Sequence, residues 1–236
     1  AFNSAVAAYD GASKSWRTVN RRISSTSANM EILTSLARLR DVSRDFVRNN
    51  SYAASAVARI ASNTIGAGII PSIQISGARL KRRVQTLVED HLDTVAIDFD
   101  ARHNLYGLEA LAVRTMVESG ECLIVRYMPD ATLRLPAPLQ IRVLEPDYLD
   151  VSKDGPQSNG TTLYQGIEFD AAGRRVAYWI YDKHPGGDAN WQIPASRRVP
   201  ARDVIHLYRA DRPGQARGVP WGAPCVMTLW DLADYE

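Results

Sequence analysis

Acidic and histidine side chains in the middle of this sequence have the types and spacing that metal or acid–base chemistry requires. Asp98 and Asp100 alternate with a phenylalanine, and in an extended segment alternate side chains point to one side, as two ligands of a divalent cation would. His103 follows, but no third hard ligand comes at a recognisable spacing. The same pattern is typical of a polar linker whose Asp or Asn caps the next helix. Both interpretations stay open.

A second pair of carboxylates, Glu118 and Glu121, flanks Ser119-Gly120, where a helical period gives way to a strand period. Paired carboxylates can serve acid–base catalysis or hold metals, but a turn between a helix and a strand explains them equally well. Together with Asp98 and Asp100, Glu121 defines one alternative function, a metal-dependent nucleic-acid enzyme.

The histidines and glycines give little support to catalysis. His206 alternates with apolar residues, with no Ser or Cys placed to use it as a base, so we interpret it as a strand histidine bonded to backbone. His91 lies on the apolar stripe of a helix and His184 in a loop. Gly66-Ala-Gly68 follows a helix and lacks the third glycine of a phosphate-binding loop. We expect no catalytic residue, no cofactor and no metal site.

The elements that position these residues follow from the apolar periodicity. It predicts helices from about Met30 to Val47, from a cap at Ser51 to Gly66, from Ala78 to Val95 and from Leu105 to Ser119, with Gly120 at the C-terminal cap. Strands are expected at Glu121–Met128, Leu139–Leu144, Leu163–Phe169, Val176–Tyr181 and Val204–Tyr208, with a hairpin turn at Asp170–Gly173.

The sequence therefore predicts an α+β fold, with N-terminal helices followed by a mainly antiparallel, β-rich region. We divide it into a flexible basic arm (1–29), a helical part (30–120), a β-rich part (121–221) and the start of a further helix (222–236). Because that last helix is only a few turns long and has no stop signal, we expect the chain to be a piece of a longer protein.

Composition and charge narrow the class of protein. With 45% hydrophobic and 23% charged residues, and no apolar run near the ~20 residues of a membrane span, the chain reads as soluble and globular. We see no signal peptide, and we expect Cys122 and Cys225 to be buried, reduced thiols. Residues 1–85 carry 13 Lys/Arg and 4 Asp/Glu (+9), whereas residues 86–236 carry 15 and 22 (−7).

This charge division has three interpretations. It fits a nucleic-acid-binding arm that acts through Arg17, Arg21 and Arg22, and that module is the second alternative function. It also fits a protomer whose basic and acidic faces meet on neighbouring copies, as in a head-to-tail ring. Separate solvated faces of an ordinary domain would show it as well.

A loop rich in Pro and Gly, Arg212–Pro224, holds polar side chains on a stiff backbone. It has no residue placed for catalysis. Arg212, Gln215 and Arg217 are therefore our candidate site residues. They would bond to carbonyls or carboxylates of a neighbouring subunit, or they would clamp the loop within its own chain.

Read in order, these segments resemble the portal proteins of tailed bacteriophages of the lambda family. The ordered set covers nearly the whole chain from about residue 9, and the loop Arg-Pro-Gly-Gln-Ala-Arg-Gly (212–218) is its most specific member. The other matching segments are SRDFVRNN (43–50), YAA (52–54), IGAGI (65–69), SGE (119–121), LQIRVLEPD (139–147), QGIEFD (165–170), GRRVAY (173–178), DVIH (203–206) and LADY (232–235).

The resemblance implies a structural subunit rather than an enzyme. It implies a dodecameric ring at one capsid vertex of the virion, assembled in the cytoplasm of the bacterial host, through which double-stranded DNA is packaged and ejected. The implied partners are further copies of the chain, that DNA, the large terminase subunit, the major capsid or scaffold protein and a head-completion or adaptor protein, with no membrane. This chain would form the wing and end where a helix leads toward the stem.

Overall fold

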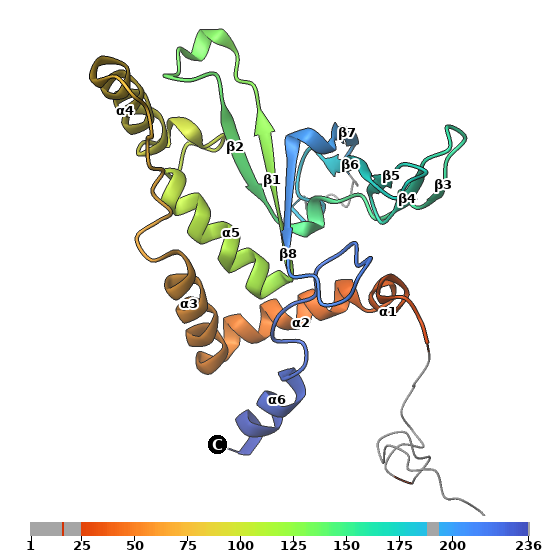
Figure 1. Ribbon diagram of the computed structural model, residues 1–236. Helices are drawn as coiled ribbons and strands as arrows, with labels where there is room; N and C mark the ends of the chain where they lie inside the picture. The colour runs from red at the N-terminus through yellow and green to blue at the C-terminus, as the bar shows by residue number, and fades with distance from the viewer. Residues whose placement is uncertain (1–15, 17–24, 188–193, 236) are drawn as a thin grey trace, which may run out of the picture.

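The structure, a computed structural model, describes residue 16 and residues 25–187 and 194–235, without the side chains of 233–235 (Figure 1). Most of the expected basic arm (1–29), including Arg17, Arg21 and Arg22, lies outside the described residues. The helices are α1 (Ala28–Leu33), α2 (Leu36–Asn49), α3 (Ser51–Ile65), α4 (Ala78–Leu92), α5 (Leu105–Ser119) and α6 (Val226–Tyr235). The strands are β1 (Glu121–Tyr127), β2 (Gln140–Leu144), β3 (Gly155–Pro156), β4 (Thr162–Tyr164), β5 (Ile167–Phe169), β6 (Arg175–Tyr181), β7 (Ser196–Pro200) and β8 (Val204–Tyr208).

The fold class is α+β with antiparallel strand pairs, as the sequence predicts. Helices α2, α3 and α5 pack around Phe46, Val57 and Val117, and α6 adds Leu229 to this cluster. The single helix expected from Met30 is in fact two, because a turn at 34–35 separates α1 from α2, where Thr and Ser are weak helix formers.

The start of α3 also differs from the prediction. Its cap is Asn50 rather than Ser51, since the Asn50 side-chain oxygen accepts the backbone N–H of Tyr52 and of Ala53. At the end of α5, Gly120 has a φ of 90° and terminates the helix as expected.

The first sheet has the order β2-β1-β8 and the second the order β3-β4-β5-β6-β7. Strand β1 is central: Leu123 is opposite Leu144 of β2 on one side and His206 of β8 on the other. A second core lies between the two sheets. It joins residues of both sheets, among them Leu123, Leu144, Ile167 and Ile180.

In the second sheet two sequence-based assignments were wrong. The segment 163–169, expected to be one strand, is a hairpin of β4 and β5 that turns at Gln165 and Gly166, both with positive φ (46° and 85°). Strand β7 was missed because SRRVP carries little apolar signal. The predicted turn at 170–173 is confirmed by the bond from the Gly173 N–H to the Asp170 carbonyl, between β5 and β6.

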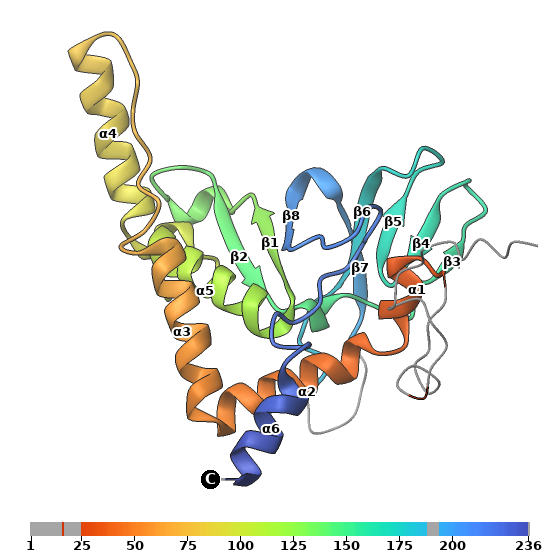
Figure 2. The same cartoon turned by 60° about the horizontal axis from the view of Figure 1, so that its bottom comes forward.

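Helices α4 and α6 project from the body at opposite ends in both views (Figures 1 and 2). Helix α4 is anchored near its C-terminal end, where the buried His91 ring bonds through Nε2 to the Leu139 carbonyl at 2.8 Å. Among the described helices, none has the length and apolar character of a membrane span.

Candidate functional site

The centre of the molecule is the carboxylate of Glu121, the first residue of β1. Because Gly120 ends α5 in a left-handed conformation, the chain turns directly into the strand and carries Glu121 inward. The side chain has no exposure to solvent. The sequence pointed to Glu121 as a carboxylate beside a turn, and the structure makes it the partner of the loop at 212–218.

Arg217 of that loop is the main partner of Glu121. Its Nη2 lies 2.6 Å from Glu121 Oε1, and its Nε lies 3.0 and 3.1 Å from the two carboxylate oxygens. The remaining terminal nitrogen, Nη1, donates to the Gln165 carbonyl at 3.1 Å, at the β4–β5 turn. Arg217 is also wholly buried. The pair therefore joins the loop to β1 and to the second sheet.

Three further donors reach the same carboxylate. Arg40 of α2 donates through Nη1 to Oε1 at 3.2 Å, His206 of β8 lies with Nε2 3.0 Å from Oε2, and the Gly218 backbone N–H donates to Oε2 at 2.8 Å. We call Arg40, Glu121, His206 and Arg217 the central ionic cluster. It links α2, β1, β8 and the loop through buried, charge-assisted bonds.

The protonation states follow from these contacts. Burial alone would raise the pKa of Glu121, but the charge of Arg217 and the hydrogen bond from His206 hold it far below its ordinary value, so the group is a carboxylate. Burial lowers the pKa of His206 although Glu121 opposes that shift. The imidazole is thus neutral near pH 7, with its proton on the Nε2 that faces Glu121.

The sequence did not single out Arg40. An arginine in an amphipathic helix usually faces solvent, yet Arg40 is 4% exposed. A signal was present, because Arg40 lies four residues after Leu36 and seven before Val47, both buried in α2. His206 also differs from expectation: it bonds to the Glu121 side chain rather than to backbone.

Two glycines allow the loop to approach the end of α5. A Cβ on Gly218 would lie 2.1 Å from the Gly120 carbonyl oxygen, and a Cβ on Gly120 would lie 2.4 Å from the Val219 carbonyl carbon. The backbones are therefore in direct contact, which only residues without side chains permit. Next in the chain, the Trp221 N–H donates to the Val117 carbonyl in α5.

The other two predicted loop residues have different surroundings. Gln215 is buried; its Oε1 accepts the N–H groups of Asp211 and Arg212, and its Nε2 donates to the Arg217 carbonyl at 2.8 Å. Arg212 is half exposed and reaches α1, where Nη1 lies 2.7 Å from Glu31 Oε2. The structure brings Gln215 and Arg217 together and directs Arg212 to the opposite side of the loop.

Asn29 of α1 also holds the loop, and the sequence gave no indication of it. Its side chain donates to the Gly214 carbonyl at 3.0 Å and accepts the Ala216 N–H at 2.8 Å. An amide has a donor and an acceptor side by side, so it can pair with a loop backbone as another peptide group would. The segment before α2 is thereby fastened to the loop.

The three carboxylates of the proposed nuclease site are not brought together. Asp98 is buried and accepts the N–H groups of three following residues, ending at His103. Asp100 pairs with Arg142 at 2.9 Å. Asp98 lies beside Ile141, which is opposite Arg126 in β1, five residues from Glu121. At about 3.3 Å per strand residue, Asp98 and Glu121 are offset by roughly 16 Å along the strand direction alone. The linker interpretation is the one that these contacts match: Asp98 holds the turn that follows it, and Asn104 caps α5 by accepting the Gly107 N–H.

The paired glutamates separate as well. Glu118 stays on α5, 3.7 Å from Arg114 one turn earlier, while Glu121 points into the central ionic cluster.

Both cysteines are free. Cys122 is buried, which raises the pKa of its thiol to about 12, but Cys225 is exposed and the prediction that both are buried was wrong for it. Cys225 precedes α6 at the outer end of the loop.

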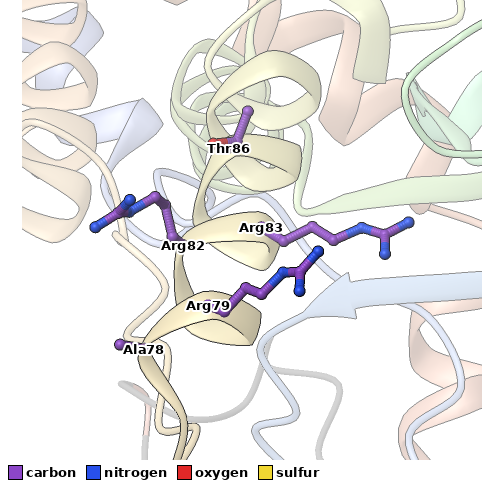
Figure 3. Close-up of a pocket in the computed structure, with 5 residues that line it drawn as sticks. All are labelled: Ala78, Arg79, Arg82, Arg83 and Thr86. Carbon is purple, nitrogen blue, oxygen red and sulfur yellow. The ribbon is translucent and has the colours of Figure 1, made fainter.

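Two further groups of side chains lie outside the central ionic cluster. On α4, Arg79, Arg82, Arg83 and neighbouring residues line a shallow, open surface hollow, with Arg82 directed away from the other two guanidinium groups (Figure 3).

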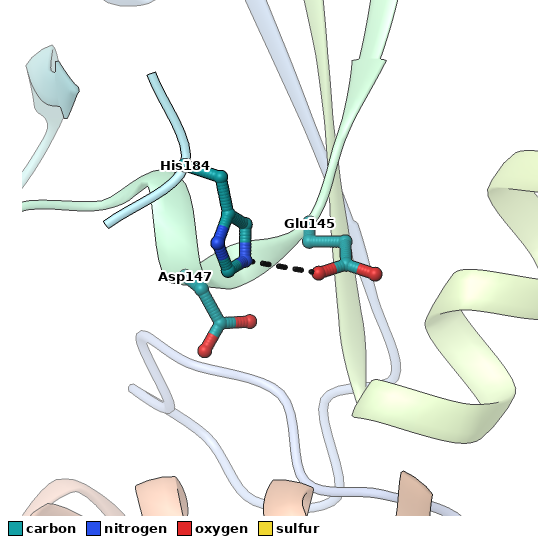
Figure 4. A group of neighbouring side chains, drawn as sticks. All are labelled: Glu145, Asp147 and His184. Atoms are coloured by element: carbon teal, nitrogen blue, oxygen red, sulfur yellow. Dashed lines mark ion pairs between the residues drawn. The ribbon is translucent and has the colours of Figure 1, made fainter. Parts of the chain in front are cut away.

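The second group is Glu145, Asp147 and His184, whose ligand atoms lie within 4.8 Å of one another (Figure 4). Arg44 of α2 pairs with both carboxylates, and His184 Nε2 lies 3.3 Å from Glu145 Oε2. His184 Nδ1 accepts the Gly186 N–H, so this ring nitrogen is already engaged within the chain. These contacts already use the ligand atoms, so we interpret this group as an ion-pair cluster.

The central ionic cluster can hold elements together, but it offers no surface to a substrate. Glu121 and Arg217 have no exposure, and every oxygen of the carboxylate accepts hydrogen bonds from the chain itself. A catalytic carboxylate must be reachable by the group it acts on. The geometry is thus that of an internal structural joint between the helices and the two sheets.

Comparison with known proteins places the chain in a family. Residues 14–236 match the model of the phage portal proteins of the lambda family, and the chain belongs to that family. It is also similar to a "Probable portal protein" of Halomonas phage phiHAP-1, with 30% identity over 141 residues, which cover 58% of this chain and 26% of that relative. The match thus spans about a quarter of the relative's length. Portal proteins are structural components of phages, as the resemblance implied.

Proposed function

We propose that this chain is the wing portion of a portal subunit that forms a ring, as a dodecamer, at one vertex of a phage capsid. Double-stranded DNA would pass through the ring when the genome is packaged and again when it is ejected. The observation that carries the proposal is the family match, which extends over residues 14–236. The buried joint supports it, since a subunit of a load-bearing ring needs its parts fixed relative to one another.

The partners in this proposal are those of a portal vertex in the virion. Copies of the chain form the ring, DNA occupies the channel, and the large terminase subunit, a capsid or scaffold protein and a head-completion or adaptor protein bind outside it. Assembly would take place in the cytoplasm of the bacterial host. We assign no DNA-contacting residue, because a channel that lets DNA slide does not need base readout.

For the loop at 212–218 we propose the role of an internal clamp rather than a subunit contact. Arg217 and Gln215 are buried within a single subunit, where Arg217 bonds to Glu121 and Gln165 and Gln215 bonds to the loop backbone. Arg212, by contrast, is half exposed, and we propose that it fastens α1 through Glu31. Arg212→Ala separates the two ideas: an internal clamp predicts unchanged ring assembly, whereas loss of the ring without loss of folding would favour a subunit contact.

Negative-stain imaging of the complete protein tests the proposed function. A closed ring with a central hole is the expected result, and a compact monomer at assembly concentrations would contradict it. DNA retention by purified heads gives a second readout. Heads assembled without the protein are expected to lack packaged DNA, and heads with normal DNA content would count against a portal.

A further inference from the structure

Helix α4 carries an unusual arrangement of charge for an isolated helix. Its first half contains Arg79, Lys81, Arg82 and Arg83, and no acidic residue occurs before Glu89. None of these four cations has an ion-pair partner among the described residues. The N-terminal end of a helix bears positive partial charge, so cations there oppose the helix dipole. A negatively charged surface that approached this cluster would be attracted to it.

The same helix also exposes apolar side chains. Leu80 is 53% and Leu87 42% exposed, and they lie on one stripe of α4 together with Val84. The segment leading to the helix adds Ile69 and Ile70, both exposed. Leucines flanked by arginines are typical of the core and rim of a protein–protein interface. A phosphate backbone would match the arginines but not the leucines.

Helix α6 is acidic and apolar, which complements the basic and apolar surface of α4. Residues 226–236 contain three acidic residues, among them Asp231, and no Lys or Arg. Asp231 is exposed, as are Met227 and Leu232, while Leu229 faces the body of the protein. Thus α6 presents an acidic and apolar surface where α4 presents a basic and apolar one. The two helices project at opposite ends of one molecule (Figure 2), so they belong to two different patches.

We infer that α4 of one subunit docks against α6 of the next, and that this contact joins neighbouring subunits head to tail. A heterologous contact uses two different patches on each copy and closes into a ring when the rotation permits. Here the two patches match in charge and in apolar character. The inference rests on the ring proposed above. The binding partner of the α4 surface is then a second copy of this chain.

Charge reversal with rescue tests the pairing in the complete protein. The double variant Arg82→Glu/Arg83→Glu and the variant Asp231→Lys should each raise the subunit concentration needed for ring formation about tenfold or more. The two combined should restore most of the loss. Arg82→Lys/Arg83→Lys keeps the charge and should assemble normally. Arg202→Glu, at a side chain that is 82% exposed, is the matched control and should have no effect.

Circular dichroism and thermal unfolding, measured beside the assembly assay, distinguish a variant that fails to fold from one that folds but fails to assemble. Rings that form equally well in both reversed variants would overturn the α4–α6 contact while leaving the proposed ring intact. If both reversed variants fail to form rings and the combined variant fails as well, this pairing would also be overturned. Intact rings with weaker DNA retention in the Arg82/Arg83 variant would assign α4 to DNA instead. A wild-type protein that forms no ring would contradict the proposed function itself.

Discussion

Arg217 and Glu121, 96 residues apart in the sequence, form a two-point ion pair that has no contact with solvent. The pair fixes the loop after β8 to the junction between α5 and β1. Arg40 and His206 surround the same carboxylate from α2 and β8. A single buried charge thereby determines how the helices and the two sheets are joined.

Removing Arg217 should destabilise the chain strongly. Arg217→Ala leaves the Glu121 carboxylate buried without its main partner, and breaking a buried pair in this way costs roughly 3–5 kcal/mol of unfolding free energy. Urea unfolding followed by circular dichroism measures the loss. The control is Arg212→Ala, whose half-exposed, solvent-screened pair with Glu31 should contribute far less to stability. Similar losses for both variants would contradict the central position assigned to Arg217.

The contact between the loop and α5 should be sensitive to one methyl group. Gly218→Ala places a Cβ 2.1 Å from the Gly120 carbonyl oxygen, so the loop must move and the protein should lose about 1–3 kcal/mol. Gly222→Ala is the matched control, because nothing lies within 4 Å of its Cβ. Equal melting temperatures for Gly218→Ala and the wild type would show that the close approach is not needed.

Stability should fall on acidification in two stages. The pKa of His206 is lowered by burial, so the unfolded chain takes up this proton first and stability decreases as pH falls below about 6.5, by at most about 1.4 kcal/mol per pH unit. Glu121, whose pKa is also lowered, adds a loss below about pH 4.3. Arg217 and Arg175 are the cations whose charges further lower the pKa of His206.

The variant His206→Gln isolates the first stage. Gln keeps an N–H donor for Glu121 but does not titrate, so the decrease between pH 7 and 5 should become shallower. Chemical denaturation at several pH values gives the two slopes. If both proteins lose stability in parallel over this range, the titrating group is not His206.

Asp98 should stabilise the turn that follows it and should not act as a metal ligand. Asp98→Ala removes the acceptor of three backbone N–H groups and should cost about 1–2 kcal/mol of stability. Divalent metal should not stabilise the wild type more than the variant in thermal unfolding. DNA cleavage that needs metal and disappears in this variant would instead support the nuclease alternative.

The sequence predicted those features that depend on local pattern. The periodicity of Leu108, Leu111 and Ala112 located α5, and Gly120 marked its end. The turn at 170–173 followed from its residue types. The hairpin at Gln165–Gly166 was missed because apolar residues continue on both sides of the turn, and β7 was missed because it is rich in arginine and depends on pairing with β6.

The central ionic cluster was harder to foresee. The sequence singled out the loop at 212–218, but its partner Glu121 was considered only as a possible catalytic carboxylate or as part of a turn. Arg40 looked like a surface arginine because charge usually marks the solvated side of a helix. Buried ion pairs are set by tertiary contacts between residues distant in the sequence, and a single sequence contains no record of such contacts.

The central claim is that this chain is part of a portal subunit that assembles into a ring. Native mass spectrometry of the complete protein tests it most directly. The account predicts one dominant species at a closed multiple of the subunit mass, expected to be twelve copies. A protein that remains monomeric at every concentration at which capsids assemble would contradict the account.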